Sequence, residues 1–163
     1  MTVMSIDSRT LRQTVGRFVT GVTVVAIDVE GEIRAMTANS FTSLSLEPPL
    51  VLFCLGKDTK AGRHIRSAPG FSISILREDQ RDLSSYFAGG WAPDAPPPPF
   101  SFMTWEGGPL LDGCIAALGC RTHGIHEGGD HWIVVGEVVA TYRAEDAGEP
   151  LVFFRGKYVG LQT

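Results

Sequence analysis

Residues 36–50 read MTANSFTSLSLEPPL, and no other stretch of this chain is as informative. Small hydroxyl and amide side chains stand between two apolar runs, and the stretch ends at Pro48-Pro49. Threonine, asparagine and serine offer many neutral hydrogen-bonding groups in little volume. Such a loop suits a large, flat ligand that has polar edges and carries phosphate. The same residues also make ordinary turn hydrogen bonds where strands end.

The segments on both sides of this stretch predict antiparallel strands. Residues 22–27 are a β-branched run, Glu30-Gly31 is a turn signal, and residues 33–38 return, which predicts a hairpin. Residues 50–55 form an apolar strand directly after the two prolines, which cannot donate to a ladder.

Later segments add more strands and define the fold class. Residues 71–75 alternate phenylalanine or isoleucine with serine, which predicts a half-buried strand. Further strands are expected at residues 102–105, 114–126, 132–142 and 151–155. About seven or eight hairpin-linked strands with two or three helices favour a mainly β protein with an antiparallel barrel. The absence of βαβ alternation and of GxGxxG argues against a doubly wound nucleotide fold.

Three short helices are expected between the strands. The first is capped by Asp7 or Ser8 and is broken at Gly21. Its apolar positions fall on one face: Leu11, Val15, Phe18 and Val19. The others cover residues 58–66 and residues 79–87, the latter capped by Asp79.

Residues 88–99 contain five prolines and two glycines without a helix or strand pattern. The four consecutive prolines at residues 96–99 are expected to give an extended, stiff backbone. An irregular loop of this kind is either a lid or contact loop, or a tolerated surface insertion.

Composition restricts the class of protein. The 163 residues are expected to form one domain, residues 1–163, with its core at about residues 11–160. A net charge of -4 argues against nucleic-acid binding. No apolar run is long enough to span a membrane, and residues 1–10 have no signal core. Three cysteines, Cys54, Cys114 and Cys120, are expected to be reduced thiols in a cytoplasmic protein.

Two other segments are candidate binding sites. Four basic side chains follow residues 50–55 and either hold a phosphate or form a solvated helix face: Lys57, Lys60, Arg63 and His64. Gly129-Asp130-His131 lies between two long strands, where it is either a polar hairpin tip or a place where a ligand approaches a titratable imidazole. No nucleophile motif and no metal-ligand pattern is evident. Redox chemistry would therefore come from a bound cofactor.

Four segments together resemble the short-chain flavin reductases, the reductase components of two-component flavin-dependent monooxygenases. Residues 18–25 (FVTGVTVV) resemble the family's opening motif, and residues 36–50 match its signature almost letter for letter. Gly129-Asp130-His131 resembles its GDH motif, and residues 149–158 (EPLVFFRGKY) resemble its closing motif. The likeness covers about residues 11–160.

This resemblance implies a split β-barrel, usually a homodimer with the flavin near the subunit interface. It implies that NADH or NADPH reduces FMN or FAD, and that reduced flavin leaves for a separate oxygenase component. By position, the flavin contacts are Thr37, Ala38, Asn39, Ser40, Ser43, Ser45, Cys54, Leu55 and Lys60. Phe87 lies over the cofactor, His131 serves the nicotinamide, and Tyr158 belongs to the same site.

Two other functions remain open from the sequence. One is an electron carrier that retains FMN on the same fold without nicotinamide-dependent turnover, and the other is a barrel that binds a ligand without redox chemistry. Residues 92–99 are richer in proline than the family pattern, which leaves the choice between FMN and FAD, and between NADH and NADPH, open.

Overall fold

The computed structural model describes residues 5–146 and 148–161. Its helices are α1 (Ser8–Val15), α2 (Lys60–His64) and α3 (Arg81–Phe87), with the short 3-10 turns η1 (Ile65–Ser67) and η2 (Glu78–Gln80). Its strands are β1 (Thr20–Gly21), β2 (Thr23–Val29), β3 (Glu32–Ala38), β4 (Thr42–Ser45), β5 (Leu50–Gly56), β6 (Gly70–Ile75), β7 (Phe102–Met103), β8 (Leu110–Leu111), β9 (Ala116–Gly128), β10 (His131–Arg143), β11 (Val152–Phe154) and β12 (Lys157–Val159). No helix in the described ranges is long and apolar enough to cross a membrane.

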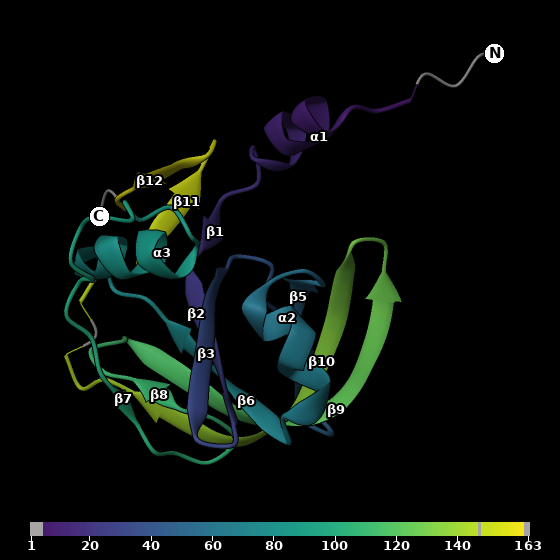
Figure 1. The fold of residues 1–163 in the computed structure, drawn as a ribbon, viewed down its shortest axis with the longest axis vertical. Coiled ribbons are helices and arrows are strands. Elements are labelled where there is room, and N and C mark those ends of the chain that lie inside the picture. The colour runs from purple at the N-terminus through teal and green to yellow at the C-terminus, as the bar shows by residue number, and fades with distance from the viewer. Residues whose placement is uncertain (1–4, 147, 162–163) are drawn as a thin grey trace.

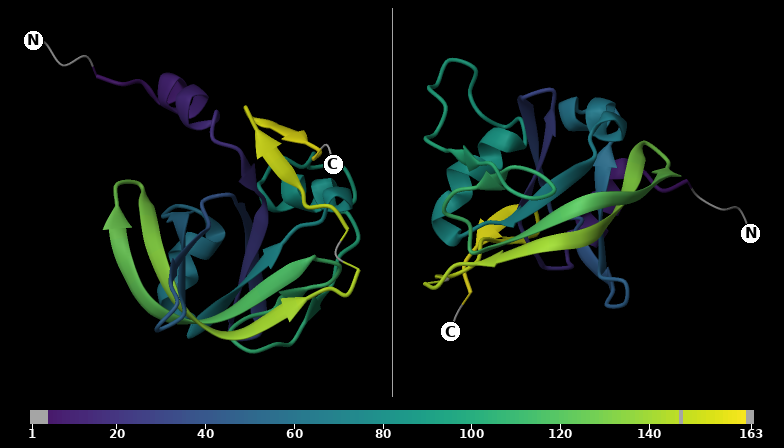
Figure 2. Two further views of the ribbon diagram at one scale, coloured as in Figure 1. Left: turned by 180° about the vertical axis from the view of Figure 1, so that it is seen from behind. Right: turned by 90° about the horizontal axis from the view of Figure 1, so that it is seen from below.

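Seven antiparallel strands form one curved sheet in the order β3-β2-β6-β9-β10-β5-β4. Its two edge strands, β3 and β4, are consecutive in the chain, so the sheet curls until its ends meet. The long β9–β10 hairpin bends around the others (Figures 1 and 2). Register shifts after Val135 and after Val138 allow this bend, because a bulge increases local twist and curvature. The mainly β, antiparallel barrel that the sequence predicts is confirmed.

Helix α2 closes the mouth of the barrel. It lies in the concavity between β3 and β10 (Figure 1). Ala61 of α2 and Ile65, which follows it, join the same buried cluster as Phe53 and Phe71, whose rings meet edge to face at 5.0 Å. Strand β2 is buried on both faces, because Val24 on its outer side packs in one cluster with Leu83 of α3 and with Leu151, which directly precedes β11.

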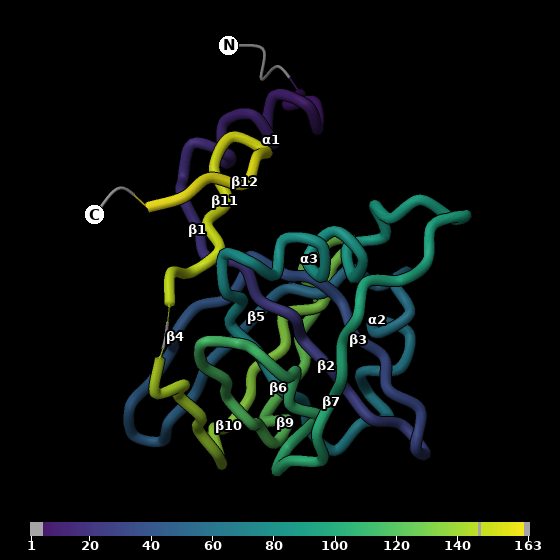
Figure 3. The backbone as a smooth tube through the Cα atoms, turned by 90° about the vertical axis from the view of Figure 1, so that its left-hand side faces the viewer, coloured from purple at the N-terminus to yellow at the C-terminus, as the bar shows by residue number. Residues whose placement is uncertain are grey.

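Strands β1, β11 and β12 form a small sheet at one end of the molecule, and α1 projects beyond it (Figure 3). Helix α1 buries none of its residues against the rest of the chain. Asp7 caps it, as predicted, and accepts a hydrogen bond from the Thr10 amide at 2.8 Å. The helix ends at Val15, so the prediction that Phe18 and Val19 belong to it is wrong; Gly16 forms its C-cap.

Three other sequence predictions need correction. Strand β6 is buried on both faces, because Ser72 donates to the Pro109 carbonyl and Ser74 accepts from the Leu111 amide at 3.3 Å. Asp79 lies inside η2 and does not cap α3. The described residues form twelve strands, more than predicted, because strands of two to four residues, such as β1, β4, β8 and β12, are too short to give a periodic signal.

Candidate functional site

Residues 39–41 join the two edges of the large sheet and form the seam of the barrel. Ser40 closes this seam, because its Oγ donates to the Cys54 carbonyl and accepts from the Cys54 amide, each at 3.0 Å. Just before it, Thr23 Oγ1 donates to the Ala38 carbonyl at 2.6 Å. The part of the chain predicted to meet the ligand is therefore also the part that closes the barrel.

A pocket of about 970 Å³, the seam pocket, runs between the seam and α1. Asn39, whose side chain is exposed, and Ser40 supply part of its polar wall. Its apolar wall includes Leu11, Val15, Phe18, Val19 and Phe41. Thr20 Oγ1 is buried in the same wall and has no hydrogen-bond partner among the described residues. This hydroxyl is an exception to the rule that buried polar groups are hydrogen-bonded.

A second pocket of about 1000 Å³, the aromatic pocket, lies between β3, the start of α2 and residues 86–102. Three predicted site residues from separate segments line it: Thr37, Lys60 and Phe87. The hydroxyl of Thr37 is already used, since it donates to the Ser84 carbonyl at 2.6 Å and holds α3 onto β3.

Tyr158 reaches the same residue of α3 from β12. Its hydroxyl lies 2.6 Å from Ser84 Oγ. Ser84 therefore joins two predicted residues that are far apart in the sequence. It is fully buried, and nothing in the local sequence of residues 81–87 marks it as a meeting point.

The remaining predicted flavin contacts lie on β4 and β5. Ser43 and Ser45 are on the edge strand β4, opposite Val51 and Leu50. Cys54 is half-buried, whereas the Leu55 side chain is fully buried inside the barrel. Leu55 therefore offers no accessible surface to a ligand in this structure.

His131 begins β10 at the exposed tip of the β9–β10 hairpin. Its Nδ1 lies 2.7 Å from Asp130 Oδ1, and this hydrogen bond, helped by the charge of the imidazole, lowers the pKa of Asp130. Strand pairing sets His131 opposite Gly56, where an added Cβ would stand 3.9 Å from His131 Nε2. The tip thus brings the imidazole to the end of β5, two residues beyond Cys54.

His131 and Tyr158 do not converge within one chain. The hairpin tip and β12 lie on opposite sides of the barrel (Figures 1 and 2). A single site that uses both residues would need them from different chains.

The three cysteine thiols differ in their burial, and a thiol-specific reagent can detect this difference. Burial raises the pKa of Cys114 and raises that of Cys120 to about 12, so both stay protonated near neutral pH. Cys54 is the most exposed of the three. We expect Ellman's reagent to modify one thiol rapidly in the native protein, and all three after unfolding in guanidinium. Cys54→Ser should remove the rapid phase; three equal rapid phases in the native protein would contradict the structure.

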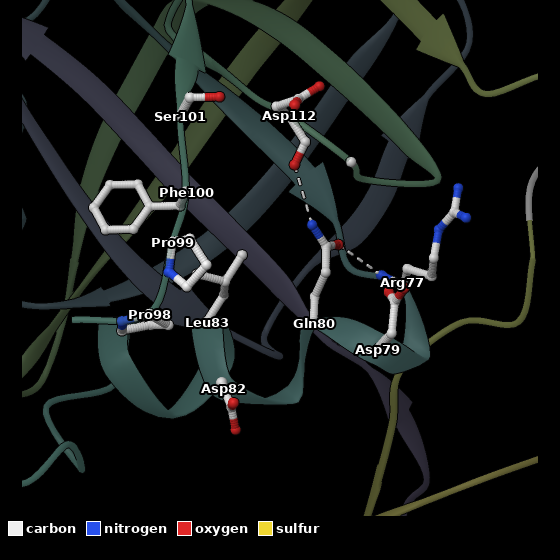
Figure 4. Close-up of a pocket in the computed structure, with 11 residues that line it drawn as sticks. Arg77, Asp79, Gln80, Asp82, Leu83, Pro98, Pro99, Phe100, Ser101 and Asp112 are labelled. Atoms are coloured by element: carbon white, nitrogen blue, oxygen red, sulfur yellow. Dashed lines mark hydrogen bonds between the residues drawn. The ribbon is translucent and has the colours of Figure 1, made fainter. Parts of the chain in front are cut away.

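A third pocket, of about 670 Å³, lies between residues 77–83, residues 98–101 and residues 112–113 (Figure 4). The Gln80 side chain links two of the segments that line this pocket. Its Nε2 donates to the Asp112 carbonyl at 3.1 Å, and its Oε1 accepts from the Arg77 amide at 2.9 Å. None of the predicted site residues lines this pocket. Phe100 lines both this pocket and the aromatic pocket, and its ring is turned away from Gln80 (Figure 4).

The polar groups that line the seam and aromatic pockets are mainly hydroxyls, an amide and cations. Such groups bind and orient a planar molecule with polar edges, and they leave electron transfer to the molecule that is bound. Within the described ranges, no group of three His, Cys, Asp or Glu side chains is placed to hold a metal ion.

Comparison with known proteins agrees with this arrangement. The chain is 41% identical over 161 residues to an NADH-dependent FAD reductase of Streptomyces globisporus, covering 93% of this chain and 85% of that protein. It is 41% identical over 147 residues to the reductase component of 4-hydroxyphenylacetate 3-monooxygenase of Thermus thermophilus, covering 90% and 92%. The solved structure of the flavin reductase PheA2 superposes with a TM-score of 0.90 at 35% identity, covering 97% and 100%. Residues 15–162 match the flavin reductase like domain, and the chain therefore belongs to the flavin reductase family.

Proposed function

We propose that this protein is an NADH-dependent flavin reductase that supplies reduced FMN or FAD to a separate monooxygenase component. The observation that carries the proposal is the seam pocket, where the exposed Asn39 and the neighbouring Ser40 stand beside a wall of apolar side chains. An isoalloxazine ring combines a flat apolar surface with a polar edge, and it suits such a wall. The names of the Streptomyces and Thermus relatives support the same reaction class.

The residues present fit a flavin whose ring lies along residues 37–40. When bound, flavin supplies the acceptor for a hydride from the nicotinamide. The Asn39 amide both donates and accepts hydrogen bonds, so it can bind the polar edge of the ring. Ser40 holds this segment against Cys54, which fixes the position of the ring. Since hydride transfer requires no protein acid or base, orientation of the two rings is the main contribution of the protein.

His131 is proposed to bind the nicotinamide nucleotide. Its Nδ1 is engaged by Asp130, which leaves Nε2 directed toward the end of β5. We expect His131→Ala to raise the apparent KM for NADH about tenfold, as loss of a hydrogen bond to a charged group does, and to change the KM for flavin little. Steady-state kinetics with each substrate varied measures this, with His126→Ala on the same hairpin as the control. An unchanged KM for NADH would remove His131 from the site.

The test of the reaction is NADH and NADPH oxidation, followed by absorbance, with and without added FMN, FAD or riboflavin. Turnover that needs free flavin in excess over enzyme supports the reductase. A protein that stays yellow after dialysis and shows no turnover would favour the electron carrier instead. A colourless protein without affinity for flavin would leave only the non-redox barrel.

We also propose a homodimer in which a second copy covers α1 and the seam pocket. Leu11, Val15 and Phe18 are more than half exposed, and Phe18 reaches 77%. A contiguous apolar surface of this kind marks an interaction site. Light scattering should give a molecular mass of twice the 17.6 kDa of one chain, and Phe18→Asp should lower this mass to that of a single chain. A single-chain mass for the unmodified protein would refute the dimer.

We propose a cytoplasmic location for the protein. The free thiols of Cys54, Cys114 and Cys120 support it, because free thiols are typical of reducing compartments.

A further inference from the structure

Lys57 connects the tip of the β9–β10 hairpin to the end of β5. Its main-chain amide donates to the Asp130 carbonyl at 3.1 Å. Its side chain reaches β9, where Nζ forms an ion pair with Glu127 Oε1 at 3.1 Å. The same Nζ stands 4.6 Å from the ring centroid of Trp132 on β10, within the range of a cation–π contact. Glu127 and Trp132 are cross-strand partners, so one side chain contacts both strands of the hairpin at its tip.

Trp132 joins this contact to the body of the protein. Its ring is half-buried and packs against the main core cluster. Arg66, which follows α2 in η1, contacts the same ring, with its Cζ 4.2 Å from the centroid. An indole that contacts two cations and the core has little freedom to move. The set of Glu127, Lys57, Trp132 and Arg66 is called the tip clamp below.

The tip clamp lies on one face of the sheet, and His131 lies on the other. Cross-strand partners share a face, and neighbouring residues of a strand point to opposite faces. Trp132 pairs with Leu55, whose side chain is buried inside the barrel, so Trp132 is also on the inner face. His131 is therefore on the outer face with Gly56 and Cys54. Its position there depends on how firmly the inner side of the tip is held.

The contacts of Lys57 leave its charge already compensated. Its side chain is only 29% exposed, and Glu127 is its ion-pair partner. An exposed ion pair and a cation–π contact are each weak, so the tip clamp holds the hairpin with contacts that a single substitution can release. This arrangement favours a role for Lys57 in placing the tip over a role as a free cation for a phosphate group.

We propose that Lys57 and Glu127 are positioning residues that hold the hairpin tip where His131 meets the nicotinamide nucleotide. This inference rests on the proposed function, because it takes the nucleotide site at His131 as given. It requires no contact between Lys57 and the nucleotide. The competing explanation is a direct contact of Lys57 with a phosphate group, and the two explanations predict opposite effects of removing the charge of Glu127.

The first experiment examines the tip without ligand or turnover. Amide hydrogen exchange of residues 126–131 should become about threefold to tenfold faster in Lys57→Met, the size expected for loss of an exposed ion pair and a cation–π contact. Lys57→Arg keeps the charge and can reach both partners, so it should restore slow exchange. Arg143→Met, at the exposed far end of β10, should leave the tip unchanged. Unchanged exchange in Lys57→Met would overturn the proposal.

The second experiment uses steady-state kinetics to separate positioning from direct binding. Lys57→Met should raise the KM for NADH about threefold, with kcat and the KM for flavin nearly unchanged, and Lys57→Arg should restore it. Glu127→Gln should raise the KM for NADH about twofold, because it releases the tip. If Lys57 instead binds a phosphate group, Glu127→Gln should lower this KM, because it frees Lys57 and removes a negative charge near an anionic ligand.

The two experiments together distinguish a failure of the tip clamp from a failure of the proposed function. A lower KM for NADH in Glu127→Gln would overturn the proposal. So would an unchanged KM in Lys57→Met if His131→Ala raises it. Faster exchange in Lys57→Met, with an unchanged KM in both Lys57→Met and His131→Ala, would instead refute the nicotinamide role of His131 and support the tip clamp as described.

Discussion

Replacing Gly62 by alanine is expected to displace α2 from β5 and to weaken both folding and flavin binding. An added Cβ would overlap the Gly56 carbonyl oxygen and would stand 2.9 Å from Thr59 Oγ1. The first of these atoms belongs to the backbone of β5 and cannot rotate away. Thr59 caps α2 by accepting from the Gly62 amide at 2.9 Å, so the start of the helix, with Lys60, would move as well.

The size of this effect follows from the cost of overpacking. A forced backbone shift in a packed region costs about 1–3 kcal/mol, and sometimes more. For a domain of this length, 3 kcal/mol lowers Tm by about 6–12 °C. Thermal unfolding by circular dichroism and flavin titration by fluorescence measure the two consequences. Gly90→Ala is the matched control, since its Cβ would meet only Ser85 O at an ordinary 3.6 Å. A Gly62→Ala protein with normal Tm would show that α2 is not packed as described.

Phe53→Ala is expected to cause the largest loss of stability. The Phe53 side chain is fully buried on β5 and packs edge to face against Phe71. Removing a buried phenylalanine ring typically costs about 3–5 kcal/mol, because both transfer free energy and packing are lost. Urea unfolding should show a lower midpoint at an unchanged slope. Met103→Ala, at a half-exposed position on β7, should cost less than about 1 kcal/mol. Equal midpoints for the two variants would mean that Phe53 is not part of the core.

The sequence was sufficient where local patterns determine the structure. The turn at Glu30-Gly31 has the positive φ angles, 55° and 81°, that join β2 to β3 in the predicted hairpin. The alternation in residues 71–75 correctly predicted a strand but not its second buried face. That face is covered by residues 109–111, which come from far along the chain and leave no local signal.

The candidate site residues stay predictions, but part of their local structure can be compared with the sequence. Residues 129–131 were correctly predicted to lie at the tip between two long strands, because glycine has a clear local preference for turns, whereas residues 42–45, within the predicted loop, form strand β4. The hydrogen-bond partners of the hydroxyls in that loop could not be predicted, since Thr37 bonds to Ser84, 47 positions away. The unpartnered Thr20 hydroxyl depends on the same long-range packing.

The closure of the barrel at residues 39–41 has an evolutionary consequence. A substitution there alters how the sheet ends meet and what the proposed flavin site presents, because Ser40 links the seam to Cys54. Residues 126–131, by contrast, are exposed at the end of a hairpin and contribute nothing to the buried core. Selection on the proposed flavin site is therefore coupled to selection for folding, whereas the proposed nicotinamide site is free to diverge. Substitutions that change the preference between NADH and NADPH are accordingly expected at the hairpin tip before they are expected at the seam.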